Sequence, residues 1–261
     1  MCPLCRLLTS SLGKKYLMAL SGIILTGFVL GHMLGNLQIF LAPEWINQYA
    51  YHLQHMPYGL LWVVRLVLLT SVVVHIVTAI SLTLENRKAR PADYEVKDTI
   101  QASYASRTMR WSGVILFGFI VFHIMHYTTK NIVDFDALEG SFKLEGVDHL
   151  VNNCYAMMYL GFSSTCVSII YAISVFLLCK HLSHGVSSMF QSLGLRNAIW
   201  RTRLDCLARV YGWVVFLGFV SIPLAVQLDF HGVFPCLFDK SSFMHAVEAA
   251  QKCCSFTGLP L

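Results

Sequence analysis

The sequence has few charged residues, and long parts of it have none. Only 13% of its 261 residues are Asp, Glu, Lys or Arg, about half of the roughly 25% that is usual in a soluble domain. The stretch 57–84 contains one charged side chain, Arg65. Four other stretches contain none: 16–41, 111–129, 152–179 and 210–228. This distribution excludes an ordinary soluble fold.

The lengths of these stretches predict membrane-spanning helices, because a helix needs about 20 apolar residues to cross the hydrocarbon core. We therefore expect an all-α integral membrane bundle of five transmembrane helices in one domain over residues 1–230, followed by a polar C-terminal tail over 231–261. The first apolar stretch is too long for a secretory signal, and no small-residue cleavage site follows it. The expected spans are about 15–41, 57–84, 108–130, 152–190 and 205–228.

The remaining charges are unevenly divided between the two sides of this predicted topology. If the N-terminus is cytoplasmic, the cytoplasmic side contains 14 Lys and Arg against 5 Asp and Glu, and the other side 5 against 9. Basic residues are enriched in cytoplasmic loops, so we expect the N-terminus inside and the C-terminus outside. The net charge of +5 follows from this topology and gives no reason to expect a nucleic-acid partner.

One histidine lies in each of four different apolar stretches: His32, His75, His123 and His181. An ionisable side chain at membrane depth is costly, and its presence therefore indicates a functional site. Imidazole is also a common axial ligand of haem iron. Two haems, each held by two histidines from neighbouring helices, would account for the whole set.

Depth along the helices sorts these histidines into pairs. With a rise of about 1.5 Å per residue, His32 and His123 lie about 14 and 9 Å from the outer boundary, whereas His75 lies about 27 Å from it. Two ligands of one metal ion need nitrogens roughly 4 Å apart, because each bond is about 2 Å long. We predict His32 with His123, and His75 with His181, provided that the fourth helix continues toward Gly194.

Four further residues are candidates for binding the cofactor. Gly31 belongs to a run of glycines whose small size gives clearance for a flat porphyrin, or for ordinary close helix packing. His126 and His184 each follow a ligand candidate by three residues, on the same helix face, and are expected to contact haem propionates or polar interior groups. Arg65 is expected to neutralise a propionate or contact quinone, unless it snorkels outward.

Four segments carry a resemblance to a known family: LGHMLGN, VVVHIVTAIS, FHIMHYTT and KHLSHGVSSMFQSLG, in this order. They resemble the diheme cytochrome b subunit, a single polypeptide of five helices, of bacterial succinate dehydrogenase and fumarate reductase. The resemblance extends to about Leu228. It implies two haems b, with His32 and His123 as ligands of the distal haem and His75 and His181 as ligands of the proximal one. The depth argument gives the same pairs.

The resemblance also implies a function, that of the membrane-anchor subunit of a succinate:quinone oxidoreductase. Such a subunit docks a flavoprotein and an iron–sulfur subunit on the cytoplasmic face of the bacterial inner membrane. It carries electrons between the iron–sulfur subunit and a quinone of the lipid bilayer. The family is best known with menaquinone as this quinone. By itself the chain is not expected to oxidise succinate, because it has no flavin site and no cysteine set for clusters.

Two alternatives remain open at the level of sequence. A haem-b subunit of a hydrogenase or formate dehydrogenase would share the buried histidines. A polytopic transporter or a thiol–quinone oxidase would use the histidines as proton relays and the Cys2-x-x-Cys5 motif for chemistry. That motif stands without a second cysteine pair nearby, so a zinc site there would lack two ligands.

Overall fold

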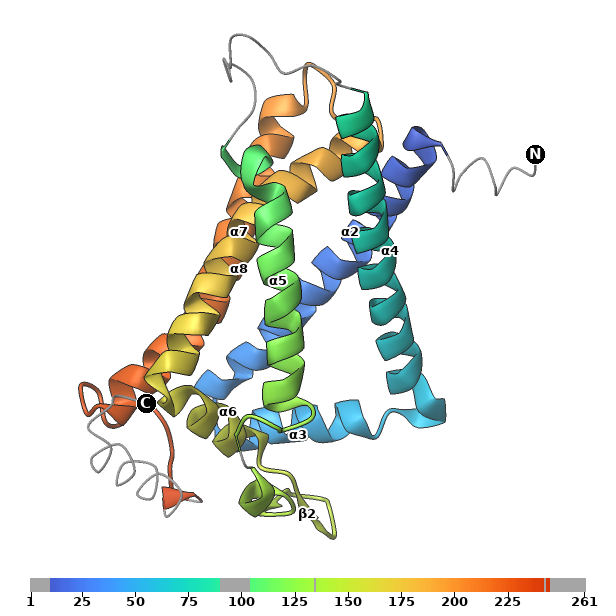
Figure 1. The fold of residues 1–261 in the computed structure, drawn as a ribbon. Helices are drawn as coiled ribbons and strands as arrows, with labels where there is room; N and C mark the ends of the chain where they lie inside the picture. Colours follow the sequence, from blue (N-terminus) through green and yellow to red (C-terminus); the bar gives the residue numbers. More distant parts are fainter. Residues whose placement is uncertain (1–9, 90–103, 134, 242, 245–261) are drawn as a thin grey trace. The chain divides into compact units, whose positions relative to one another are not determined.

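The structure is a computed structural model that describes residues 10–89, 104–133, 135–241, 243 and 244. The described chain is mostly helical (Figure 1). Cys2 and Cys5 lie outside the described residues. The helices are α2 (Ser11–Asn36), α3 (Pro43–Gln54), α4 (Leu60–Lys88), α5 (Tyr104–Tyr127), α6 (Cys154–Ser163), α7 (Thr165–Ser192) and α8 (Arg201–Phe230), with short 3-10 turns at Leu37–Phe40, Pro57–Gly59 and Asp136–Leu138. Strands β1 (Phe142–Lys143) and β2 (Leu150–Val151) form a short antiparallel pair. In it, Phe142 lies opposite Val151.

Within the described residues, five helical segments are long and apolar enough to cross a membrane. Helix α4 has an exposed apolar face, as a helix in contact with lipid needs. Four of its residues are each more than half exposed and recur every three or four positions along this face: Leu66, Leu69, Val73 and Val77. Continuous exposed apolar surface of this kind marks contact with lipid or a partner. The prediction of five helices long and apolar enough to span a membrane is confirmed, at Ser11–Phe40, Pro57–Lys88, Thr108–Tyr127, Thr165–Ser192 and Arg201–Phe230.

The fourth span differs from the predicted range 152–190, because the structure divides this range into two helices. Helix α6 ends at Ser163, and Ser164 is extended with ψ of 117°. Serine hydroxyls compete for backbone groups and so favour helix ends, and here the Ser168 Oγ donates to the carbonyl of Phe162 at 2.8 Å. Only α7 is long enough to span, and α6 is a separate short helix.

The C-terminal end of α7 agrees with the sequence prediction. The helix continues eleven residues beyond His181 to Ser192. Gly194 follows with φ of 76°, in the left-handed region that glycine adopts most easily at helix ends. Beyond it, Arg196 donates to both carboxylate oxygens of Asp205 on α8, at 3.0 and 2.8 Å.

The chain divides into two compact units. The first unit comprises 1–30, 59–112 and 179–213, and the second comprises 31–58, 113–178 and 214–261, so that the boundaries fall inside α2, α5, α7 and α8. The first unit contains 15 Lys and Arg against 5 Asp and Glu, a net +10, and the second contains 4 against 9, a net −5. Most basic residues, 15 of 19, therefore belong to one unit.

In the first unit, polar contacts connect helices that are distant in sequence. Near the start of α2, Ser11 Oγ donates to a Glu85 oxygen of α4 at 2.7 Å, and Lys14 forms an ion pair with the same carboxylate. The hydroxyl of Tyr211 on α8 donates to the carbonyl of Thr26 on α2 at 2.7 Å. These contacts hold α2 against both α4 and α8.

Helices α7 and α8 approach closely at Gly212. A Cβ at this position would lie 2.7 Å from the carbonyl oxygen of Cys179 and 2.5 Å from the Oγ of Ser183. Because the carbonyl belongs to a rigid helix, we expect Gly212→Ala to lower the free energy of unfolding by about 1–3 kcal/mol. The measurement is thermal unfolding of the chain in detergent. Gly185→Ala on α7 is the control, since a Cβ there meets nothing within 4 Å, and equal effects of the two variants would contradict the prediction.

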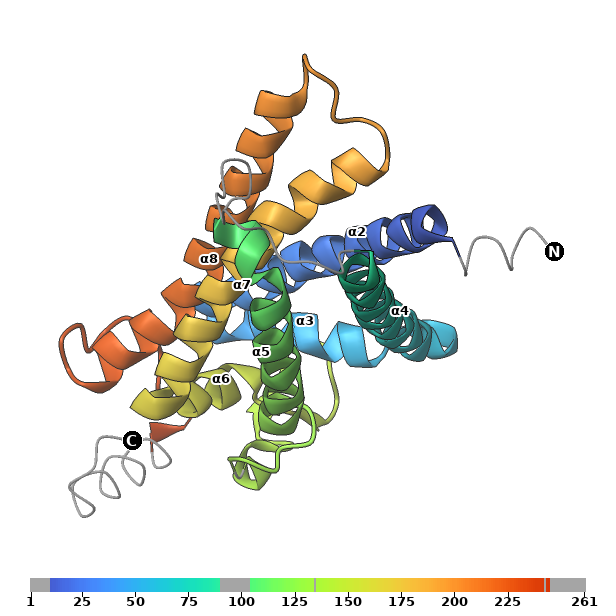
Figure 2. The same ribbon diagram turned by 45° about the horizontal axis from the view of Figure 1, so that its top comes forward.

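In the second unit, the connection 42–56 between the first two expected spans is mostly helix. Helix α3 begins at Pro43, whose fixed φ suits the first turn, and it lies beside α6 (Figures 1 and 2). The two helices share buried amide contacts. Asn47 on α3 donates to the Asn153 side chain at 3.3 Å and accepts from the backbone N–H of Tyr155 at 3.1 Å. Asn153 also caps α6 through the N–H of Ala156.

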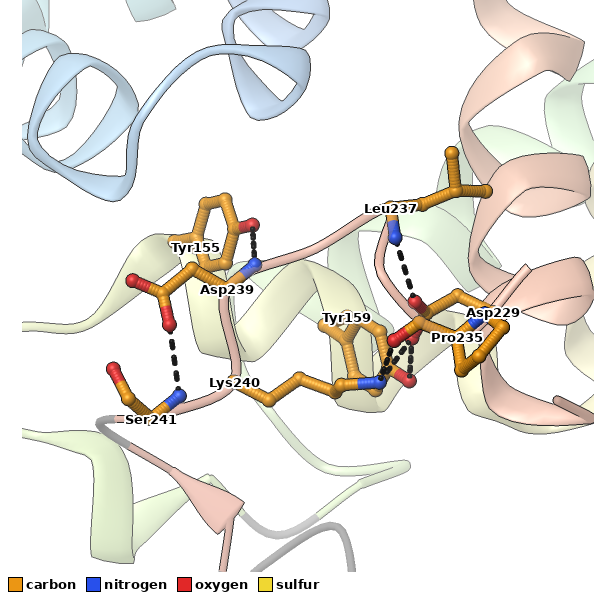
Figure 3. Close-up of polar contacts among 8 residues, drawn as sticks. All are labelled: Tyr155, Tyr159, Asp229, Pro235, Leu237, Asp239, Lys240 and Ser241. Carbon is orange, nitrogen blue, oxygen red and sulfur yellow. Dashed lines mark hydrogen bonds and ion pairs between the residues drawn. The ribbon is translucent and has the colours of Figure 1, made fainter.

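The chain after α8 folds back onto α6 and is not simply a polar tail (Figure 3). The fully buried carboxylate of Asp229 accepts hydrogen bonds from the Tyr159 hydroxyl at 2.6 Å, the Lys240 ammonium at 2.8 Å and the Leu237 N–H at 3.1 Å. The Tyr155 hydroxyl accepts from the Asp239 N–H at 3.0 Å, and burial raises the pKa of this phenol to about 12. The described residues that follow α8 therefore pack against α6.

Candidate functional site

His32 and His123 lie together in the second unit. His32 comes from α2 and His123 from α5, and their ring centroids are 5.7 Å apart with the planes at 80°. Aromatic rings from two helices surround them, since Phe219 of α8 lies 5.9 Å from His32 and Phe119 of α5 lies 6.0 Å from His123. The structure therefore brings together the first pair that the sequence predicts.

His75 and His181 lie together in the first unit. His75 comes from α4 and His181 from α7, and their ring centroids are 6.4 Å apart with the planes at 56°. The edge of the His75 ring also faces α2, where a Cβ on Gly22 would lie 3.7 Å from its Cε1 atom. The second predicted pair is thus also brought together.

The separation of the rings within each pair suits two axial ligands of one iron. Metal–imidazole bonds are about 2 Å long, so two imidazoles on opposite sides of one metal have centroids roughly 6 Å apart. A bare ion such as zinc needs three or four protein ligands, and the described residues contain no group of three or more His, Cys, Asp or Glu that could hold a metal. A porphyrin supplies its own four nitrogens, so a pair of histidines is the complete protein contribution to a bis-imidazole haem.

In the first unit, a serine from a neighbouring helix contacts the Nδ1 atom of each histidine. Ser21 Oγ of α2 lies 3.3 Å from His75 Nδ1, and Ser112 Oγ of α5 lies 3.2 Å from His181 Nδ1. Both serines donate their hydrogen within their own helix, Ser21 to the carbonyl of Leu17 at 2.8 Å and Ser112 to that of Met109 at 3.0 Å.

Each serine oxygen is therefore left to accept a hydrogen bond from a histidine Nδ1–H. A neutral imidazole with its hydrogen on Nδ1 has a free electron pair on Nε2. Metal-ligating histidines commonly have this arrangement, because the bond at the second nitrogen fixes tautomer and orientation. In this tautomer, the Nε2 atoms of His75 and His181 would be free to bind a metal.

In the second unit, a tyrosine takes the place of the serines. The hydroxyl of Tyr171 on α7 lies 3.0 Å from His123 Nδ1 and 3.0 Å from His126 Nδ1. His126 is fully buried, and its Nε2 atom has no hydrogen-bond partner among the described residues. Of the two partners expected for His126, a haem propionate or a polar interior group, the structure shows a polar interior group, the Tyr171 hydroxyl.

Sequence reasoning missed Ser21, Ser112 and Tyr171, although each is a hydroxyl residue within a charge-free apolar stretch. A hydroxyl in such a stretch needs a hydrogen-bond partner when it is buried. That requirement was the available signal, but it does not name the partner. The partner lies 48 to 69 positions away along the chain.

The other candidates from the sequence have different surroundings. A Cβ on Gly31, directly before His32, would meet nothing within 4 Å, and Gly31 lies on an exposed part of α2. His184 is half-buried one turn after His181 on α7. Arg65 is exposed, and its guanidinium carbon lies 4.9 Å from the centre of the Trp62 ring. Arginine beside tryptophan on an exposed face is typical of a membrane interface.

Comparisons of this chain with models of protein families, with curated proteins and with solved structures gave no match.

Proposed function

We propose that this chain is the membrane-anchor cytochrome b subunit of a succinate:quinone oxidoreductase. In this function it carries electrons between an iron–sulfur subunit and a membrane quinone through two bis-histidine haems b. The observation that carries the proposal is the presence of two histidine pairs, each drawn from two different apolar helices and each spaced for one iron. The ordered sequence segments around these histidines supply the choice of enzyme.

The residues of the chain supply binding and orientation. Haem b, when bound, supplies reversible one-electron chemistry at its iron. His32 and His123 hold one haem, and His75 and His181 hold the other. The hydroxyls of Ser21, Ser112 and Tyr171 fix the ligand rings. The apolar helix faces exclude water, which keeps the surroundings of both haems at low polarity and helps to set their potentials.

The uneven charge of the two units supports the proposed orientation. Because basic residues prefer the cytoplasmic side, the charged residues of the first unit other than Arg65, which are 14 Lys and Arg against 5 Asp and Glu, face the cytoplasm in this proposal. There they present a basic surface to the flavoprotein and iron–sulfur subunits. Arg65 is proposed to neutralise a haem propionate or to contact quinone, and His184 to contact a haem propionate or a polar interior group. Menaquinone is the proposed electron carrier.

An optical difference spectrum tests this proposal directly. The purified chain, reduced with dithionite and compared with its oxidised form, is expected to show b-type haem bands, with two haems per chain by pyridine haemochrome assay. A transporter would show no haem. A chain that is folded and purified from cells grown with sufficient iron but lacks haem would refute the proposal.

Co-purification then distinguishes the proposed enzyme from other haem-b complexes. An affinity tag on this chain is expected to recover a flavoprotein with covalently bound flavin and an iron–sulfur protein, and the recovered complex is expected to oxidise succinate. The chain alone is expected to have no such activity. Recovery of a nickel- or molybdenum-containing enzyme instead would favour a hydrogenase or formate dehydrogenase.

A further inference from the structure

The two histidine pairs differ in what supports their ligands. His75 and His181 each face a serine oxygen whose hydrogen is donated within its own helix. His123 faces a phenol that is shared with a second imidazole, that of His126. A phenol has a single hydrogen to donate, so the Tyr171 oxygen donates to one of these rings and accepts from the other.

The direction of the two bonds follows from the role of His123. If His123 binds iron through Nε2, its Nδ1 atom carries the hydrogen and donates to the Tyr171 oxygen. The phenol hydrogen is then donated to His126 Nδ1, and the hydrogen of His126 lies on Nε2. His126 supplies the acceptor that this direction requires. Hydrogen bonds in a chain polarise one another. Donation of the phenol hydrogen to His126 therefore also makes the Tyr171 oxygen a better acceptor for the Nδ1–H of His123.

We propose that Tyr171, supported by His126, is a positioning residue that orients His123 and sets the reduction potential of the haem held by His32 and His123, separately from the other haem. This inference rests on the proposed function. A hydrogen bond from the Nδ1–H of a ligand raises the basicity of the imidazole. A more basic ligand stabilises ferric over ferrous iron, so the bond to Tyr171 lowers the potential of this haem.

The packing of Tyr171 allows the hydroxyl to be removed with little loss of contact. Its ring lies edge-on to Phe119 and Phe162, with centroids 5.0 and 4.9 Å away, and a phenylalanine keeps both contacts. A matched control is Tyr127, which lies in the same cluster with its centroid 5.9 Å from His123. The Tyr127 hydroxyl is buried and has no hydrogen-bond partner among the described residues.

The test is a redox titration of the full chain, followed through its optical bands and the low-spin ferric EPR signals. Tyr171→Phe is expected to raise the potential of one haem by about 59 mV, which corresponds to a tenfold change for one electron. It is also expected to weaken retention of that haem about 10- to 100-fold. His126→Phe is expected to shift the same haem in the same direction by less, and Tyr127→Phe to shift neither.

Several outcomes would overturn the inference. Unchanged potentials and EPR signals in Tyr171→Phe, with both haems bound, would refute it while leaving the proposed function in place. Loss of both haems in Tyr171→Phe but not in Tyr127→Phe would show that the hydroxyl supports the fold and not one ligand. Ser112→Ala must shift only the haem that Tyr171→Phe leaves unchanged, and Ser112→Thr must restore it. An unaltered chain without haem would overturn the proposed function itself.

Discussion

Replacement of His123 by alanine is expected to reduce the haem content of the chain from two to one, and replacement of His32 is expected to remove the same haem. The reason is that the two rings lie 5.7 Å apart and come from different helices, so either substitution would leave the iron of the proposed haem with one protein ligand. The measurement is haem per chain by pyridine haemochrome, combined with the EPR signal of the haem that remains.

The second pair provides the reciprocal experiment. His75→Ala and His181→Ala are each expected to remove the other haem, because these rings are 6.4 Å apart. The double variant His32→Ala/His123→Ala must retain the spectrum that His75→Ala loses. His52→Ala, at an exposed position on α3, serves as the control and is expected to keep both haems. If His32→Ala and His75→Ala removed one shared haem, the pairing would be wrong.

Replacement of Lys240 by methionine is expected to lower the free energy of unfolding by about 3 kcal/mol, because removal of one partner of a buried ion pair leaves an uncompensated charge. The charge in question is the carboxylate of Asp229, whose side chain has no exposed surface. Hydrogen bonds from Tyr159 and Leu237 remain, which places the effect at the lower end of the usual range. Unfolding of the chain in detergent micelles measures it.

A second ion pair in the same unit provides the control. Lys130 pairs with Glu139, whose side chain is 51% exposed, and exposed pairs contribute about 0–1 kcal/mol. Lys130→Met is therefore expected to have a small effect. The double variant Asp229→Asn/Lys240→Met should be less destabilised than the two single effects summed, since it contains no unpaired charge. Equal effects of Lys240→Met and Lys130→Met would contradict the assigned role of the buried pair.

Some features of this molecule are local, and the sequence by itself was sufficient for them. A charge-free stretch long enough to cross a bilayer is visible in any such sequence, so the five spans were predicted. The rise of a helix is constant, so the depth of His32, His75, His123 and His181 could be calculated, and the structure brings the predicted partners together. The end of α7 before Gly194 was also predicted from a local signal.

Other features depend on contacts between distant residues, and only the tertiary structure decided them. At the break between α6 and α7, Gln227 of α8 donates to the carbonyls of Phe162 and Ser163. Where the chain leaves α8, Asp229 accepts from Tyr159 of α6. These partners lie more than 60 positions apart. The hydroxyls that contact the histidine rings also come from distant parts of the sequence, since Ser21 and His75 are 54 positions apart. Periodicity and hydropathy report which side of a helix is apolar, but they do not report which neighbouring helix lies against it. For that physical reason the sequence indicated which histidines form pairs, and the packing of the helices decided what holds each ring in place.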